Sequence, residues 1–116
     1  MTTRSQSAIL IRDLLIRIPQ EFPARVWRRN VGIGVRGNYH VTFGHKGESD
    51  IQGIIGPQSR FLAIEVKCSG RLSKEQKSFL KMIEAHGGIA IEARELRKTL
   101  ETIRLLIGAE FTESSF

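Results

Sequence analysis

Three segments of the chain repeat their apolar residues every three or four positions, the spacing that gathers them on one side of a helix. They run from Ser5 to Ile18, from Leu72 to Ile83 and from Leu96 to Ile107. Pro19 follows the first segment as a stop signal, and Ser73 stands where the second needs an N-cap. The pattern therefore predicts three helices.

Short runs of apolar and β-branched residues between these helices predict strands. The expected strands are Arg25–Asn30, Tyr39–Phe43, Asp50–Ile55, Arg60–Lys67 and Ile89–Ile91. A Gly56-Pro57 turn separates the third and fourth, which makes them plausible antiparallel neighbours. The order of elements predicts an α/β or α+β fold, with a mixed β-sheet flanked by helices in a single domain over residues 1–116 and a frayed tail at 110–116.

Two local features need separate interpretation. The segment 31–38 has three glycines within six residues, and their spacing does not fit a dinucleotide-binding fingerprint, so we expect a flexible loop or hairpin tip. Trp27, in the first strand, is expected to belong to the core rather than to act as a base-stacking platform.

Composition adds a preference for an anionic partner. The chain has 116 residues, enough for one core, and 18 Lys and Arg against 12 Asp and Glu give a net charge of +6. Nucleic acid is the leading partner, although a merely soluble basic surface or an anionic membrane surface would carry the same charge. A single cysteine, Cys68, excludes an internal disulfide and a cysteine-based zinc cluster. No membrane-spanning segment or signal peptide is evident, so a cytoplasmic location is expected.

Candidate chemistry lies in the fourth strand. Side chains alternate between the two faces of a strand, so Glu65 and Lys67 share one face, opposite Leu62, Ile64 and Val66. By itself, this pattern is typical of a strand with one solvated face. Asp50, however, opens the neighbouring strand and places a second carboxylate where it could approach Glu65.

Gln76 interrupts the apolar stripe of the second helix, which predicts an amide directed toward the sheet, although a residue at the edge of the stripe could also reach solvent. Two carboxylates suit Mg²⁺, which prefers oxygen ligands. A lysine beside them can orient a water molecule and neutralise charge at a phosphate. These residues fit metal-assisted phosphodiester hydrolysis.

The same residues resemble a known nuclease pattern. Glu48-Ser49-Asp50 followed by Ile64-Glu65-Val66-Lys67 resembles the PD-(D/E)xK nuclease core. The continuation Gly70-Arg71-Leu72-Ser73-x-x-Gln76-x-x-Phe79-Leu80, closing with Gly87-Gly88, is similar to the VRR-NUC family (virus-type replication-repair nucleases). The resemblance extends roughly from Ser5 to Ile91. The acid-then-ExK element alone has low specificity, and the ordered combination is more specific.

The resemblance implies a restriction-endonuclease-like fold and a Mg²⁺-dependent nuclease, with Mn²⁺ as a substitute. Asp50 and Glu65 would bind the metal together with the Val66 carbonyl, Lys67 would act on the nucleophile and Gln76 would support the site. The family usually has a glutamate in its first helix, where this chain has Gln6. A neutral amide at this possible metal site puts a second metal, or strong activity, in question.

Basic residues flank these positions and are expected to contact DNA phosphates. The candidates are Arg28, Arg29, Arg36, Lys46, Arg71, Lys74 and Lys77, with Lys81 on the same helix. The lysines could equally form an ordinary solvated helix face. Phosphate contacts do not read bases, so we expect recognition of backbone shape.

The resulting hypothesis is a structure-selective DNA endonuclease similar to Holliday-junction resolvases, in the cytoplasm of a bacterium or a phage-infected host cell. One small domain offers one active site, so cutting both strands of a four-way junction calls for a homodimer. Two alternatives stay open. One is a non-catalytic DNA-binding protein that keeps the nuclease fold, and the other is a nuclease acting on linear DNA or RNA.

Overall fold

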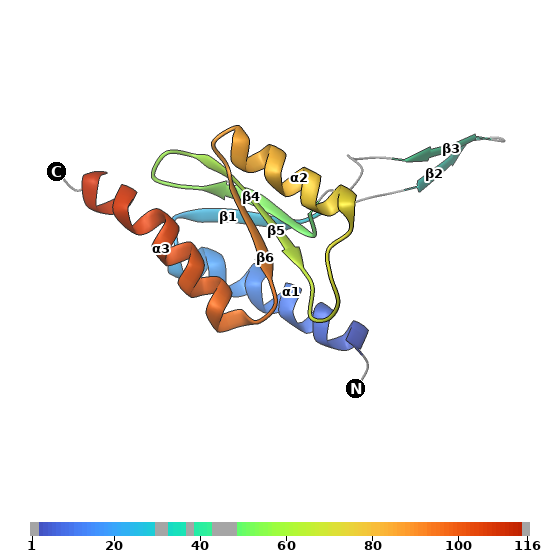
Figure 1. The fold of residues 1–116 in the computed structure, drawn as a ribbon, viewed down its shortest axis with the longest axis horizontal. Helices are drawn as coiled ribbons and strands as arrows, with labels where there is room; N and C mark the ends of the chain where they lie inside the picture. Colours follow the sequence, from blue (N-terminus) through green and yellow to red (C-terminus); the bar gives the residue numbers. More distant parts are fainter. Residues whose placement is uncertain (1–2, 30–32, 37–38, 43–48, 115–116) are drawn as a thin grey trace.

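A mixed four-stranded β-sheet is the centre of the computed structural model, which describes residues 3–29, 33–36, 39–42 and 49–114 (Figure 1). Its strands lie in the order β1 (Ala24–Arg28), β4 (Ile51–Ile55), β5 (Arg60–Val66) and β6 (Ile89–Ala93). β1, β4 and β5 pair antiparallel, and β6 pairs parallel with β5. The α+β fold expected from the sequence, with a mixed sheet flanked by helices, is confirmed.

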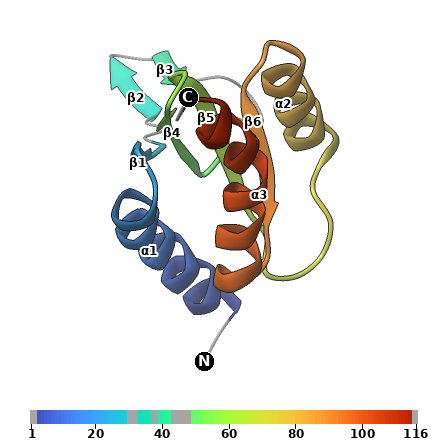
Figure 2. The same ribbon diagram turned by 90° about the vertical axis from the view of Figure 1, so that its left-hand side faces the viewer.

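Helices cover the two faces of this sheet unequally. α1 (Thr3–Glu21) and α3 (Leu96–Ser114) pack on one face (Figure 2). Their buried leucines and isoleucines join those of β4, β5 and β6 in the main core. α2 (Lys74–Ala85) connects β5 to β6 and lies against these two strands. We call the face that α2 covers the α2 face.

Strand alternation decides which residues reach the core. Leu62, Ile64 and Val66 of β5 point toward α1 and α3 and are 0 to 6% exposed. The intervening residues of β5, among them Ala63 and Glu65, point to the α2 face. β5 is thus buried on both sides, with its one carboxylate held under α2.

The C-terminal end of α2 lies close to the sheet at Gly88. A Cβ added to Gly88 would lie 2.6 Å from Ile83 Cγ2 and 2.9 Å from the Phe61 carbonyl oxygen, so only glycine fits there. Arg60 of β5 donates a hydrogen bond of 2.7 Å from Nε to the carbonyl of Gly87, just beyond the helix. These contacts hold the C-terminal end of α2 against the sheet.

The part of the α2 face over β1 and β4 carries exposed apolar side chains. Trp27 is 43% exposed and Ile54 is 47% exposed. The expectation that Trp27 belongs to the core is therefore wrong. Val26 of the same strand packs against the core below α1, and alternation directs Trp27 to the opposite face, beyond the strands that α2 covers.

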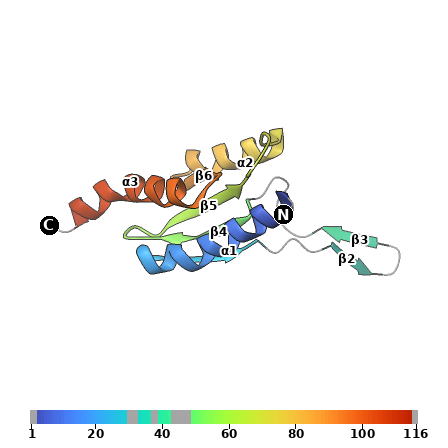
Figure 3. The same ribbon diagram turned by 90° about the horizontal axis from the view of Figure 1, so that it is seen from below.

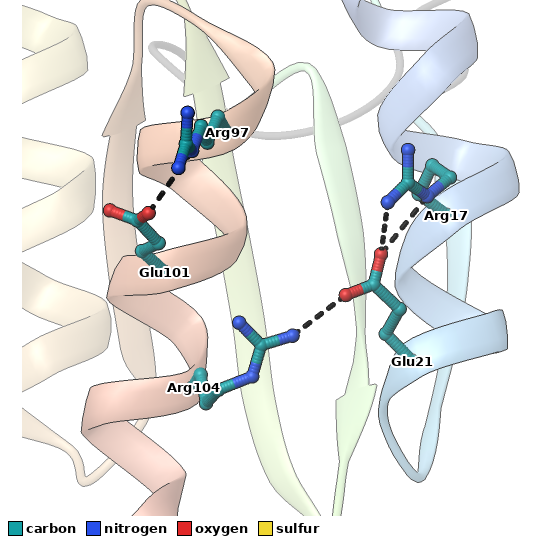
Figure 4. Close-up of polar contacts among 5 residues, drawn as sticks. All are labelled: Arg17, Glu21, Arg97, Glu101 and Arg104. Carbon is teal, nitrogen blue, oxygen red and sulfur yellow. Dashed lines mark hydrogen bonds and ion pairs between the residues drawn. The ribbon is translucent and has the colours of Figure 1, made fainter.

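Charged side chains join α1 to α3 on the core side (Figure 4). Arg17 donates two hydrogen bonds to Glu21 Oε2, and Arg104 of α3 donates one of 2.8 Å to Glu21 Oε1. The Arg104 guanidinium also lies 5.5 Å from the ring centroid of Phe22. One carboxylate therefore links the end of α1 to the middle of α3.

Element boundaries differ from the sequence predictions at two helices. Pro19 was expected to stop the first helix, but α1 continues to Glu21 and Phe22 still donates a helical hydrogen bond of 2.9 Å to Ile18. Proline removes one hydrogen bond without blocking the following ones, so a last turn can form after it. α3 continues to Ser114, whereas a frayed tail was expected from residue 110.

The glycine-rich region contains an antiparallel hairpin. β2 (Ile33–Arg36) pairs with β3 (Tyr39–Thr42). The strand expected from Tyr39 is confirmed, whereas Ile33–Arg36, expected to be part of a loop or hairpin tip, is a strand. Figure 3 shows both strands away from the four-stranded sheet. In the described part of the chain, no helix is both long and apolar enough to cross a membrane.

Candidate active site

The pairing of β4 with β5 brings the two predicted carboxylates together. Ile51 lies opposite Ile64, so Asp50, one residue earlier, comes next to Glu65. Asp50 Oδ2 accepts a hydrogen bond of 2.9 Å from the backbone N–H of Val66. This bond fixes the Asp50 side chain at the end of β5 and leaves its other oxygen available for a ligand.

Glu65 is the most unusual polar residue of the sheet because it is only 4% exposed. Its Oε1 accepts a hydrogen bond of 2.8 Å from Gln76 Nε2. Its Oε2 is also buried, and no described residue forms a hydrogen bond with it. A buried oxygen without a partner is costly, and such an atom calls for a functional explanation.

Gln76 supports Glu65 through the N-terminal cap of α2. Its Oε1 accepts a hydrogen bond of 2.7 Å from the backbone N–H of Ser73, and the Ser73 hydroxyl accepts one of 3.1 Å from the Gln76 backbone. A backbone N–H can only donate, so the amide oxygen must face Ser73 and the amide nitrogen must face Glu65. The capping box therefore sets the orientation in which Gln76 meets the carboxylate.

The surroundings of Glu65 favour its protonated form. Burial raises its pKa from the ordinary 4.5 to about 8, and the negative charge of the neighbouring Asp50 acts in the same direction. The positive charges of Arg29 and Lys67 lower the pKa and offset part of this effect. Asp50, Glu65, Arg29 and Lys67 thus form one electrostatic cluster.

Lys67 follows the last residue of β5 and is half-buried. Its backbone N–H donates a hydrogen bond of 2.9 Å to the carbonyl of Ala93, which continues the pairing of β5 with β6. Its Cε lies 3.7 Å from the position a Cβ would take at Gly70, and Gly70 has a φ of +78° that disfavours any other residue. Lys67 therefore leaves the sheet edge beside a tight turn.

Arg94 fastens this turn, a role that the sequence did not suggest. Its Nη2 donates a hydrogen bond of 2.6 Å to the Gly70 carbonyl, and its Nε donates one of 2.6 Å to Glu92 Oε2. An arginine two residues after a glutamate in a strand was a weak signal for this pair. The segment after Lys67 is thereby tied to the end of β6.

Two further residues lie near the carboxylates on the α2 face. Arg29 donates its backbone N–H to the Asp50 carbonyl at 2.8 Å, and its charge acts on Glu65. Gln52 lies opposite Ala63, two residues from Asp50 on the same side of the strand, and is 8% exposed. The sequence singled out Arg29 only as a phosphate contact and did not single out Gln52, because its alternation with isoleucines looks like an ordinary half-buried strand.

The other predicted residues lie outside this cluster. Gln6 is exposed and lines a hollow of about 390 Å³ together with Asp13 and Cys68, and no described contact links it to Glu65. The expected phosphate contacts Arg28, Arg71, Lys74, Lys77 and Lys81 are all exposed. The Arg36 side chain and Lys46 lie outside the described residues.

The cluster can supply oxygen ligands to a divalent cation. Across the described ranges, no three His, Cys, Asp or Glu side chains converge as a ready metal site. Two carboxylates do converge, and the unpartnered Glu65 Oε2 and the second Asp50 oxygen are the hard donors that Mg²⁺ prefers. The residues therefore fit a cation that keeps several waters and binds few protein groups.

A larger hollow, of about 670 Å³, lies between α1 and α3 on the opposite side of the sheet. Its charged residues include Arg17 and Arg104, which both pair with Glu21. It contains no buried polar atom left without a partner among the described residues. The Asp50–Glu65 cluster is the better candidate because Glu65 Oε2 is buried there without a hydrogen-bond partner among the described residues.

A scan against models of known protein families finds no match, and a search of curated proteins finds no similar sequence.

Proposed function

We propose that this chain is a divalent-metal-dependent nuclease of the PD-(D/E)xK type, related to the VRR-NUC family. The observation that carries the proposal is the buried Glu65 carboxylate, whose Oε2 has no partner among the described residues and which lies beside Asp50. Two carboxylates in this position repel each other unless a proton or a cation lies between them. A bound Mg²⁺ or Mn²⁺ would resolve this conflict.

Asp50 and Glu65 would hold the cation, with the Val66 carbonyl as a further ligand. When bound, the cation supplies Lewis acidity at the phosphate and offsets the charge that develops during hydrolysis. The Val66 N–H already fixes one Asp50 oxygen, and Gln76 fixes one Glu65 oxygen. Each carboxylate is thereby oriented by one hydrogen bond and keeps its second oxygen for a ligand.

Lys67 and Arg29 supply the positive charge of the site. Both act on Glu65 from nearby, so both can approach a phosphate that reaches the carboxylates. The Lys67 ammonium would orient the attacking water and stabilise negative charge on the phosphate oxygens. Gln76 acts through Glu65 as a positioning residue, because its amide is held by the cap of α2.

DNA is the proposed substrate, and a four-way or otherwise branched junction is the proposed structure. The net charge of +6 favours a polyanion, and exposed Arg28, Arg71, Lys74 and Lys77 can contact its phosphates. Resolving a junction requires two cuts, so the active form would be a homodimer with one site per chain. Cleavage would leave a 5′-phosphate and a 3′-hydroxyl.

The proposal is tested by single-turnover cleavage of a substrate panel in Mg²⁺. The panel contains a four-way junction, a flap, linear duplex, single-stranded DNA and RNA. We expect the native chain to cut the junction, and Asp50→Asn, Glu65→Gln and Lys67→Met each to reduce the rate by about 100-fold or more. Lys98→Met, which changes an exposed lysine on α3, on the other side of the sheet from the carboxylates, is the matched control for charge.

The panel also separates the alternatives. A native chain that binds the junction but cuts nothing in Mg²⁺ or Mn²⁺ is a DNA-binding protein without catalysis. A chain that prefers linear duplex or RNA is a nuclease of another substrate class. Loss of activity in the Lys98→Met control as large as in Lys67→Met would contradict the assigned role of Lys67.

A further inference from the structure

Trp27 lies on the α2 face, the same side of the sheet as the two carboxylates. It pairs with Gln52 of β4, which in turn pairs with Ala63 of β5, two residues before Glu65. Paired residues share a face, so Trp27, Gln52 and Glu65 all point to one side. Given strand spacing and rise, the Cα atoms of Trp27 and Glu65 are on the order of 12 Å apart.

The Trp27 side chain is exposed although it is large and mostly apolar. It is 43% exposed, and Ile54, diagonal to it on the same face, is 47% exposed. Arg25 and Arg29 lie two residues to either side in sequence and therefore on the same face, and Arg29 also acts on Glu65. An aromatic ring between two arginines on an open sheet surface suits a nucleic-acid base stacked on the ring, with phosphates near the guanidinium groups.

Together, these observations restrict the form of the substrate. A base can stack on a protein side chain only when its own face is free, which is not the case inside a continuous duplex. Arg25 and Arg29 place positive charge on both sides of Trp27, and Arg29 also acts on Glu65. A nucleic-acid strand whose phosphate reaches Glu65 can therefore pass over this surface.

We infer that Trp27 is a stacking platform for an unpaired base of the nucleic acid whose phosphate reaches Asp50 and Glu65. The inference rests on the proposed nuclease function and narrows its substrate class to strands with unpaired bases beside the cut, as at flaps, at single-stranded ends and at junctions opened at the branch point. Trp27 contacts the substrate but takes no part in proton transfer or in metal binding.

Trp27 is the only tryptophan of the chain, so its fluorescence reports on this surface directly. The test titrates an oligothymidylate of about 12 nucleotides, within the range that small single-strand-binding folds cover, into the native chain in EDTA. Anisotropy of a labelled oligonucleotide monitors saturation independently. A blunt duplex of the same length is the comparison probe.

We expect the oligothymidylate to quench Trp27 emission and to protect it from acrylamide, whereas the blunt duplex binds without either effect. Trp27→Ala should weaken oligothymidylate binding by about 10-fold. Trp27→Phe, which keeps an aromatic ring, should retain most of the affinity. Ile16→Ala, which removes a 51% exposed apolar side chain from α1 on the other side of the sheet, should change nothing.

Unchanged emission at saturating oligothymidylate, or equal affinity of the Trp27→Ala and native chains, would overturn the inference. An equal response to the blunt duplex would overturn its restriction to unpaired bases. An emission shift that depends on protein concentration without any oligonucleotide would assign the surface to self-association instead. The native measurement does not depend on whether Trp27→Ala folds.

Cleavage in Mg²⁺ distinguishes this inference from the proposed function. If the chain cuts branched DNA but its Trp27 emission does not respond to the oligothymidylate, the nuclease function stands and the stacking inference is wrong. If the oligothymidylate quenches Trp27 emission but the chain cuts no DNA, Trp27 is part of a binding surface and the proposed nuclease function is wrong.

Discussion

Glu65 places an ionisable carboxyl where water barely reaches it. Burial and the neighbouring Asp50 charge raise its pKa to about 8, so the metal-free protein holds a proton there at neutral pH. Because a cation and this proton compete for the same carboxylate, metal binding should release the proton. The residue that would bind the metal therefore also couples stability to pH.

This coupling has a definite sign. The folded protein binds the Glu65 proton more tightly than the unfolded chain, whose glutamate has the ordinary pKa of 4.5. The resulting stabilisation is complete below about pH 4.5 and is lost as the pH rises through about 8, by at most about 1.4 kcal/mol per pH unit.

Urea denaturation in EDTA at several pH values between 5 and 8 measures this effect. The free energy of unfolding of the native chain should fall with pH more steeply than that of Glu65→Gln, a neutral isostere that still accepts the Gln76 hydrogen bond. Parallel pH profiles for the two chains would show that Glu65 does not hold a proton in the folded state.

At the residue scale, local patterns predicted the carboxylate cluster well. Alternation along the strand put Glu65 and Lys67 on one face, and the Gly56-Pro57 turn predicted the antiparallel partner that brings Asp50 beside Glu65. Arg94 was not foreseen, because its bond to the Gly70 carbonyl joins positions 24 residues apart in sequence. No local pattern records such a contact.

At the scale of elements, the start of α2 connects helix capping to the candidate site. Gln76 closes the capping box with Ser73 and holds Glu65 with the other end of the same amide. The sequence predicted Ser73 as the cap and Gln76 as a residue facing the sheet, but not that one side chain does both. A substitution that disrupts the N-terminal cap of α2 would therefore also disturb the hydrogen bond that orients the Glu65 carboxylate.

Two substitutions separate these tasks. Ser73→Ala removes the cap and should lower the free energy of unfolding by about 1 kcal/mol at both pH 5 and pH 8. Gln76→Glu keeps a cap acceptor but replaces the amide donor with a second carboxyl beside Glu65, so its cost should grow with pH. Urea denaturation at the two pH values compares them, and a pH-independent cost of Gln76→Glu would contradict the contact with Glu65.

The link between α1 and α3 depends on the shared Glu21 carboxylate. A double-mutant cycle of Glu21→Gln and Arg104→Met, read by thermal or urea denaturation, should give a coupling energy of at most about 1 kcal/mol, because both side chains are partly exposed. High salt should reduce this coupling. A coupling of zero at low salt would mean that apolar packing alone joins the two helices.

Boundaries and contacts of elements were less predictable than their existence. Pro19 did not end α1, because a proline blocks only its own hydrogen bond and packing against the sheet supports the next turn. Trp27 was misplaced for a different reason. Its alternation with Val26 was readable, but the strands that α2 covers depend on the order β1-β4-β5-β6, which the sequence did not define.

At the scale of the whole molecule, the two faces of the sheet have different roles. One is closed by α1 and α3 over a continuous apolar core, and the other is covered by α2 over β5 and β6 but exposes Trp27 and Ile54. The carboxylate cluster lies at the boundary between the covered and exposed parts of the α2 face. This arrangement places the buried Glu65 and the half-buried Asp50 beside a basic, partly aromatic surface.

The central claim is that Asp50 and Glu65 hold a divalent cation, and localised iron chemistry tests it most directly. Fe²⁺ is bound in place of Mg²⁺, and ascorbate with peroxide then cleaves the polypeptide backbone next to the bound iron. We predict cuts beside Asp50 and between Glu65 and Val66 that excess Mg²⁺ suppresses and that Glu65→Gln abolishes. Cuts that map instead to the hollow lined by Gln6 and Asp13, or cuts that Mg²⁺ does not suppress, would contradict the claim.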